Sequence, residues 1–121
     1  NSELNIIDPY IFSEGGNYNS EYISLLKDIL HNAKAKHYII IPKSISTDNV
    51  YKNSIETEFD NIEIYQTNLF HDRMWISNRN KGFSVGTSLN GIGKKVALIN
   101  SMDSNDVKDI INIILEANLF T

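Results

Sequence analysis

Hydrophobic and polar residues alternate along this chain with two different periods, which divide it into short strands and amphipathic helices. Apolar runs of strand length lie at 4–12, 36–42 and 62–66. The first run contains Asp8-Pro9, and because proline cannot donate to a sheet ladder, we expect this proline to set the end of the strand. The run KHYIIIP at 36–42 lacks alternation, which is typical of a strand buried on both faces.

Helical periodicity fills the intervals between these runs and the end of the chain. Apolar residues recur at spacings of three and four over 20–33, 48–59 and 104–118, which predicts three helices. The expected caps are Ser20, then Thr47 or Asp48, then Asp103 or Ser104. The residues predicted to face inward are Tyr22, Ile23, Leu25, Leu26, Ile29, Leu30 and Ala33, then Val50, Tyr51, Ile55 and Phe59, then Val107, Ile110, Ile111, Ile114, Leu115 and Leu119.

The pattern changes after the third strand. Two extended runs, at 70–78 and 82–90, are joined by Arg79-Asn80-Lys81, which indicates a hairpin, and one more strand is expected over 96–99. Alternating strands and helices before this point predict parallel pairing with right-handed crossovers. We therefore expect one α/β domain over residues 1–121, built as a mixed β-sheet flanked by three helices.

Composition narrows the function classes. The chain lacks cysteine, which excludes disulfides and cysteine-type zinc sites, and its three histidines, His31, His37 and His71, are not spaced as a metal cluster. We therefore expect neither a metal nor a cofactor. Because no apolar run approaches the roughly 20 residues that span a bilayer, and the start is not a signal peptide, we expect a cytoplasmic location. The start at Asn1 suggests a domain cut from a longer protein.

Positive charge is concentrated in one segment of an acidic chain. Residues 71–95 hold five cations and one anion, a net charge of +4, whereas the whole chain is −4 and the remainder therefore −8. Such a segment can attract an anion without making the protein a general nucleic-acid binder. The alternative that the charges alone leave open is a solvated hairpin with scattered lysines.

The side chains of this segment suit a phosphate. On a strand over 70–78, alternation would put His71, Arg73 and Trp75 on one face, where the cation neutralises phosphate oxygens beside the imidazole. Ser88 and Asn90 share a face of the next run and offer neutral hydrogen-bond donors. The remaining candidate ligands for the phosphate are Thr87, Lys94 and Lys95.

Asp8 is a further candidate, because an aspartate at the end of a strand can point into a site. A turn-forming or helix-capping role explains the same residue equally well.

These residues resemble the motif of the phospholipase D superfamily, which runs His, any residue, Lys, four residues, Asp and, about six residues later, Gly-Ser-x-Asn. His71 matches the histidine, Arg73 stands at the lysine and Asn78 at the aspartate, where it would support the site. The run Gly86-Thr87-Ser88-Leu89-Asn90 is similar to the last element with one extra residue. The order of strands and helices also resembles one half of that fold, so a phospholipase-D-like half is expected.

The resemblance implies two alternative functions. In the family the histidine attacks phosphorus and forms a phosphohistidine, and single-motif members are active as dimers, so His71 would be the nucleophile of a homodimeric phosphodiesterase or nuclease. The His-Asp-Arg version is similar to the C-terminal phospholipase-D-like modules of proteins with an N-terminal microtubule-interacting-and-trafficking domain. Those modules bind phosphoinositide membranes, which implies a C-terminal domain that binds a phosphodiester without turnover.

We favour binding over catalysis, because both the lysine and the aspartate of the motif are replaced and arginine is not equivalent to lysine at a tight site. The expected partners are a phosphodiester ligand (nucleic acid or lipid headgroup), a second copy of the chain, and other domains of a parent protein. By resemblance, bacterial single-motif proteins of this kind often act on nucleic acids. A purely structural role for His71 and Arg73 at the end of a hairpin is the third interpretation.

Overall fold

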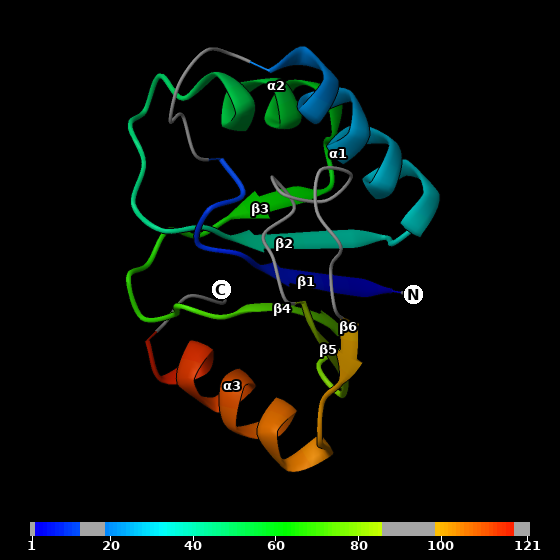
Figure 1. Cartoon of the computed structure of the whole chain (residues 1–121), viewed down its shortest axis with the longest axis vertical. Helices are drawn as coiled ribbons and strands as arrows, with labels where there is room; N and C mark the ends of the chain where they lie inside the picture. Colours follow the sequence, from blue (N-terminus) through cyan, green and yellow to red (C-terminus); the bar gives the residue numbers. More distant parts are fainter. Residues whose placement is uncertain (1, 13–18, 86–98, 118–121) are drawn as a thin grey trace.

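The computed structural model describes residues 2–12, 19–85 and 99–117, which form a mixed sheet between two helical layers (Figure 1). In the described residues, the strands are β1 (Glu3–Ile7), β2 (His37–Ile41), β3 (Ile62–Ile64), β4 (Arg73–Ser77), β5 (Lys81–Val85) and β6 (Ile99–Ser101), and the helices are α1 (Ser20–Ala33), α2 (Val50–Glu58) and α3 (Ser104–Glu116).

The strands lie in the order β3-β2-β1-β4-β5-β6. β1 pairs with β2, and β2 with β3, in parallel, whereas β4, β5 and β6 pair with their neighbours in antiparallel fashion. The predicted α/β class and mixed sheet are confirmed. A parallel half and an antiparallel half meet where β4 lies beside β1.

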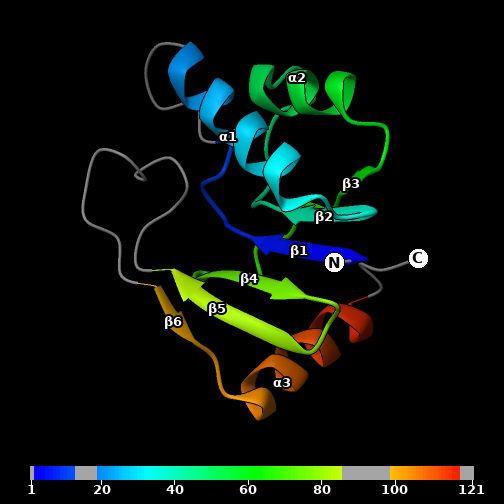
Figure 2. The same cartoon turned by 90° about the vertical axis from the view of Figure 1, so that its right-hand side faces the viewer.

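Helices cover the two faces of the sheet unequally. α1 and α2 lie on one side, next to β1, β2 and β3, and α3 lies on the other side, next to the antiparallel half (Figure 2). Alternate side chains of β1 and β2 point to opposite faces of the sheet and therefore belong to two separate hydrophobic cores. β2 is buried over Tyr38 to Ile41, as its unbroken apolar run predicted.

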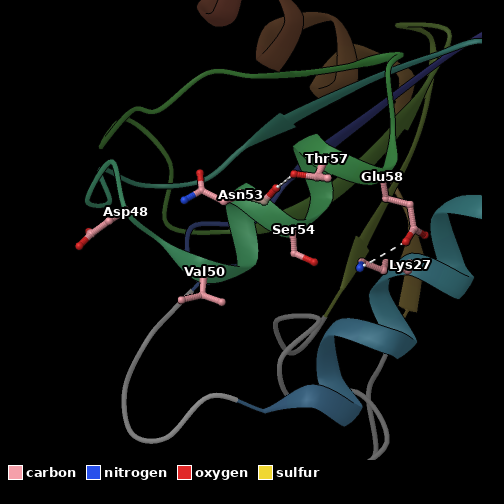
Figure 3. A pocket seen from close by; sticks show the side chains of 7 residues that line it. All are labelled: Lys27, Asp48, Val50, Asn53, Ser54, Thr57 and Glu58. Atoms are coloured by element: carbon pink, nitrogen blue, oxygen red, sulfur yellow. Dashed lines mark hydrogen bonds and ion pairs between the residues drawn. The ribbon is translucent and has the colours of Figure 1, made fainter.

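An ion pair joins α1 to α2 at the surface. Lys27 Nζ lies 3.3 Å from Glu58 Oε1, at the side of a pocket of about 510 Å³ between the two helices (Figure 3). The His31 Nε2 atom lies 2.8 Å from the other Glu58 oxygen. Hydrogen bonding by His31, and then by Lys27, lowers the pKa of the Glu58 carboxyl.

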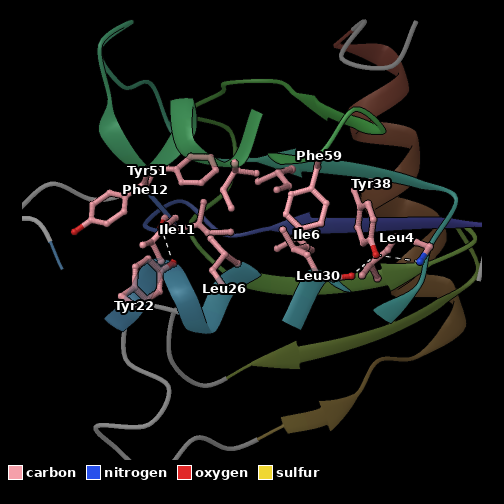
Figure 4. Packing of buried hydrophobic residues seen from close by; sticks show 14 residues of the cluster. Leu4, Ile6, Ile11, Phe12, Tyr22, Leu26, Leu30, Tyr38, Tyr51 and Phe59 are labelled. Carbon is pink, nitrogen blue, oxygen red and sulfur yellow. Dashed lines mark hydrogen bonds between the residues drawn. The ribbon is translucent and has the colours of Figure 1, made fainter. Parts of the chain in front are cut away.

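The larger core lies between these helices and the parallel strands (Figure 4). Leu26 and Leu30 of α1 pack on Ile6 and other sheet residues, and the rings of Tyr22 and Tyr51 meet edge to face with centroids 5.6 Å apart. The second core, under α3, contains Ile7, Ile39, Ile41, Phe70, Met74, Ile76, Val107, Ile111 and Ile114. Burial of these apolar side chains supplies the main drive for folding.

Helix starts differ from the predicted ones by one or two residues. α1 is capped by Asn19 rather than Ser20, and α2 by Asn49 rather than Thr47 or Asp48, whereas Asp103 caps α3 as predicted. Asparagine caps a helix as well as serine does, so adjacent candidates cannot be separated by residue type. Asn49 is chosen because it is buried and also donates to the Phe12 carbonyl at 2.8 Å.

Three sequence predictions about burial and strand length are wrong. Val50 and Leu115 were expected inside but are 51% and 45% exposed, because each helix buries a narrower stripe than its apolar residues suggest. The first strand ends at Ile7, directly before Asp8-Pro9 as expected of the proline, but the predicted span of 4–12 is too long, because the apolar residues up to Phe12 are buried in turns. The run at 70–78 is extended only over β4, while residues 86–90, 96–98 and Leu119 lie outside the described residues.

The β4–β5 hairpin is confirmed, and its turn holds the start of β1. Asn78 and Arg79 have φ of 53° and 61°, and the Asn80 N–H donates to the Ser77 carbonyl, as in a type I′ turn. Asn78 Oδ1 accepts hydrogen bonds from the backbone N–H of Ser2 and of Glu3, at 3.1 and 3.0 Å.

The second contact of this turn is an ion pair. Arg79 donates from Nε to Glu3 Oε2 at 2.7 Å and from Nη2 to Oε1 at 3.1 Å. This two-point geometry orients the pair more strongly than a single contact does. The outer end of β1 is therefore tied to the hairpin by both backbone and side-chain bonds.

Gly82 allows α3 to approach the sheet. A Cβ at this position would lie 2.9 Å from Val107 Cγ2 and 3.0 Å from the Met102 sulfur. Both distances are shorter than normal carbon contacts, so a side chain here would push α3 away from β5.

We predict that Gly82→Ala lowers the free energy of unfolding by about 1–3 kcal/mol, through overpacking against Val107. Val107→Ala opens space at the same point, so the double variant should be destabilised by less than the sum of the single variants, with a coupling of at least about 0.5 kcal/mol. Urea denaturation of the four proteins measures this. Strictly additive losses would contradict the proposed contact.

We predict a pH-dependent contribution from the Glu3–Arg79 pair. Burial alone would raise the pKa of the Glu3 carboxyl, but hydrogen bonds from Arg79 and Asn5 outweigh it, so the pKa lies below the ordinary 4.5. A lowered pKa in the folded state means that the stabilisation is present above the unfolded pKa and disappears as pH falls through the folded one. Because Arg79 is 39% exposed, solvent screens the pair.

Arg79→Gln should therefore cost about 0.2–1 kcal/mol at pH 7 and less at pH 3. Lys108→Gln, an exposed change on α3, is the matched control and should cost little at either pH. Denaturation curves at the two pH values test the prediction. A loss for Arg79→Gln that is equal at both pH values would show that the ion pair is not its cause.

Candidate functional site

One edge of the sheet collects the ends of four strands. The carboxyl ends of parallel β1 and β2 meet there, and because β4 runs antiparallel to β1, its first residue reaches the same edge. The last residue of β5, Val85, lies opposite Arg73. Ligands in α/β proteins bind outside the carboxyl ends of parallel strands, where the strand connections change direction.

Two cations share one aromatic ring at this edge. The Arg73 Cζ atom lies 5.1 Å from the centroid of the Tyr10 ring, and the Lys43 Nζ atom lies 4.9 Å from it. Lys43 is placed by its backbone, whose N–H donates to the Pro9 carbonyl at 3.3 Å. Within the described residues, neither cation forms an ion pair with a carboxylate.

Arg73 has an unused donor. Its Nε atom is buried and has no hydrogen-bond partner among the described residues. A buried guanidinium donor without an acceptor is costly, since it has lost its hydration and gained nothing in return.

Asp8 is the acidic group at this edge. It follows β1 and is 1% exposed, and because Ile7 lies opposite Met74 in the antiparallel pair of β1 and β4, the backbone of Asp8 lies beside that of Arg73. Its Oδ1 accepts the N–H of Tyr10 at 2.9 Å. The turn-forming interpretation of Asp8 is therefore correct, and this turn sets the position of the Tyr10 ring.

Behind this turn lies Tyr22. Burial, and secondly the charge of Asp8, raise the pKa of the Tyr22 hydroxyl far above its ordinary value. The hydroxyl stays protonated and donates to the Ile11 carbonyl at 2.6 Å. It is a structural group that fixes the chain after β1.

His71 is exposed and lies two residues before β4 begins. The prediction that strand alternation places it on the face of Arg73 and Trp75 is therefore not supported at His71, because the extended ladder starts only at Arg73. In the described part of the chain, the His71 ring has no hydrogen-bond partner. It is accessible, and no described carboxylate orients it.

Asp72 lies toward the side of the sheet that α3 covers. It helps to line a pocket of about 440 Å³ beside the start of α3, which also contains Asp103 and Asp106. The full lining is Asp72, Arg73, Met74, Ser84, Val85, Ser101, Met102, Asp103 and Asp106. This acidic pocket is unsuited to a phosphate.

The structure does not bring Asn78 to this edge. Asn78 lies beyond the far end of β4, where its side chain binds Ser2 and Glu3. The other predicted phosphate ligands, Thr87, Ser88, Asn90, Lys94 and Lys95, lie outside the described residues.

Sequence reasoning missed Tyr10 and Lys43. Both lie within three residues of the carboxyl end of a parallel strand, and that position was the available signal. Among the described residues, no group of three or more histidine, aspartate and glutamate side chains could hold a metal ion, and no helix has the length and apolarity to cross a bilayer.

Comparison with known proteins assigns no family. No protein-family model matches this chain, and no curated protein sequence matches it.

Proposed function

We propose that this domain binds a phosphate or phosphodiester group at the edge formed by β1, β2 and β4, with attenuated or no catalysis. The observation that carries the proposal is the pair of cations, Arg73 and Lys43, at the Tyr10 ring, with the Arg73 Nε donor buried and unused. A phosphate oxygen supplies the missing acceptor.

The chemistry of the two cations favours a phosphate over a single carboxylate. A guanidinium presents several donors in one plane and binds two phosphate oxygens at once, while an ammonium on a flexible stem adds a point charge. An oxyanion that offers at least two free oxygens, as a phosphate or a phosphodiester does, fits this combination.

The resemblance to the phospholipase D superfamily supports the same location. Its motif residues His71 and Arg73 precede and begin β4, and β5 ends at this edge. Thr87, Ser88, Asn90, Lys94 and Lys95 follow β5 in the sequence and remain part of the proposed phosphate site. A cytoplasmic location, a homodimer and further domains of a parent protein also remain predictions.

The environment of His71 favours binding over turnover. A catalytic histidine is normally oriented by a hydrogen bond to its second ring nitrogen, and no described residue provides one. The exposure of His71 is the observation that favours the second candidate function, a homodimeric phosphodiesterase or nuclease. In such a homodimer, a second copy of the chain could approach the exposed His71 ring.

We predict that Arg73→Gln weakens binding of a phosphodiester at least about tenfold, and Lys43→Gln severalfold, because each removes one cation from the site. The effects should be larger at low salt, where charges are least screened. Titration with inorganic phosphate and a dinucleotide, followed by NMR, measures the affinities. Lys108→Gln on α3 is the control, and an equal loss in that variant would contradict the site.

We predict that the wild type does not hydrolyse single-stranded DNA, RNA or a chromogenic diester, and that His71→Ala lowers affinity only modestly. Purified wild type and His71→Ala are assayed side by side. Hydrolysis that disappears in His71→Ala would instead establish the phosphodiesterase.

A further inference from the structure

A pair of aromatic side chains lies on the sheet face that carries Arg73. Trp75 of β4 lies directly opposite Phe83 of β5, so the two side chains are cross-strand neighbours on one face. Both are half-buried. Arg73 shares this face, because successive side chains of a strand alternate.

Helices leave this part of the sheet less covered than the rest. α1 and α2 lie beside β1, β2 and β3 (Figure 2), and Trp75 packs only at the margin of their core. Phe83, Val85 and Ile99 belong to neither of the two buried clusters of the described residues. Ile99 lies opposite Val85 on the same face and is 64% exposed.

Cations stand at both ends of this aromatic pair. Arg73 is at the edge described above, and Lys81 begins β5 at the other end, with its Nζ atom 5.9 Å from the Phe83 ring centroid. The described residues of β4, β5 and β6 place no acidic side chain on this face. Lys81 pairs with Ser77, which lies four residues beyond Arg73 on β4, so the two cations are anchored about 13 Å apart along the strands.

We propose that this face, formed by Arg73, Trp75, Lys81 and Phe83, is a stacking surface for bases, so that the phosphodiester ligand is a single-stranded nucleic acid. This inference rests on the proposed function, since it places one backbone phosphate at Arg73 and Lys43. Proteins that bind single strands combine aromatic side chains, which stack on bases, with cations that follow the backbone.

The alternative source of a phosphodiester, a lipid headgroup, fits this face less well. A bilayer is reached by apolar side chains that protrude from loops or helices, whereas Trp75 and Phe83 are half-buried within a sheet. A lipid headgroup also offers no flat ring for the aromatic pair. Unpaired bases offer such a ring at every nucleotide.

The test compares two ligands of about twelve units, an oligothymidylate and an abasic strand with the same phosphates but no bases. Trp75 is the single tryptophan of the chain, so its fluorescence reports on this face alone. We expect the oligothymidylate to bind about tenfold more tightly and to quench Trp75. The abasic strand should bind through Arg73 without quenching.

Two variants sharpen the comparison. Phe83→Leu keeps an apolar side chain but removes the ring, and should weaken oligothymidylate about tenfold while leaving the abasic strand unchanged. Lys81→Gln should weaken both ligands and reduce the salt dependence of binding, whereas Lys108→Gln should change neither. Should Phe83→Leu prove unfolded by circular dichroism, the wild-type comparison of the two ligands decides alone.

The outcomes separate the two proposals. Equal affinity for both ligands without quenching, or Arg73-dependent binding to anionic phospholipid vesicles but not to the oligothymidylate, would overturn the stacking surface and leave the phosphate site standing. Absence of any Arg73-dependent binding to phosphate, strands or vesicles would overturn both.

Discussion

The pairing of β4 against β1 is the constraint on which the rest of the molecule depends. A parallel strand beside β1 would need another crossover helix, whereas an antiparallel one returns directly and brings its first residue to the carboxyl edge. This single change of direction creates both the mixed sheet and the meeting point of Arg73 with the segment after β1. Fold and candidate site thus have one cause.

The parts of the fold that follow from strong periodicity could be predicted. α1 was expected over the residues it occupies, because seven apolar positions repeat at helical spacing. Pro9 correctly indicated the end of β1, but the residues after it could not be recognised as a turn, since apolar residues buried in a turn look like apolar residues buried in a strand. An apolar sequence pattern predicts which residues are buried better than it predicts where the backbone turns. Here the turn after β1 is formed by the hydrogen bond from the Tyr10 N–H to Asp8.

The candidate site was predicted only where it is local in sequence. Arg73 was recognised by its neighbours in the chain, but Lys43 lies in the segment after β2 and reaches the edge only through parallel pairing. Asn78 was assigned by counting along a motif, and the tight turn after β4 carries it to the opposite end of the strand. Residues joined by tertiary contacts require the sheet order, which no motif contains.

The hydrogen bonds between the hairpin turn and the start of β1 have a consequence for the distant edge. Side chains on a strand alternate, so a slip of β4 by one residue along β1 would exchange its faces and turn Arg73 toward α3 in place of Met74. The Asn78 and Arg79 contacts lock the register at the far end of the strand. These contacts fix the register at one end of β4, and the register determines which face of the sheet carries the Arg73 guanidinium at the other end.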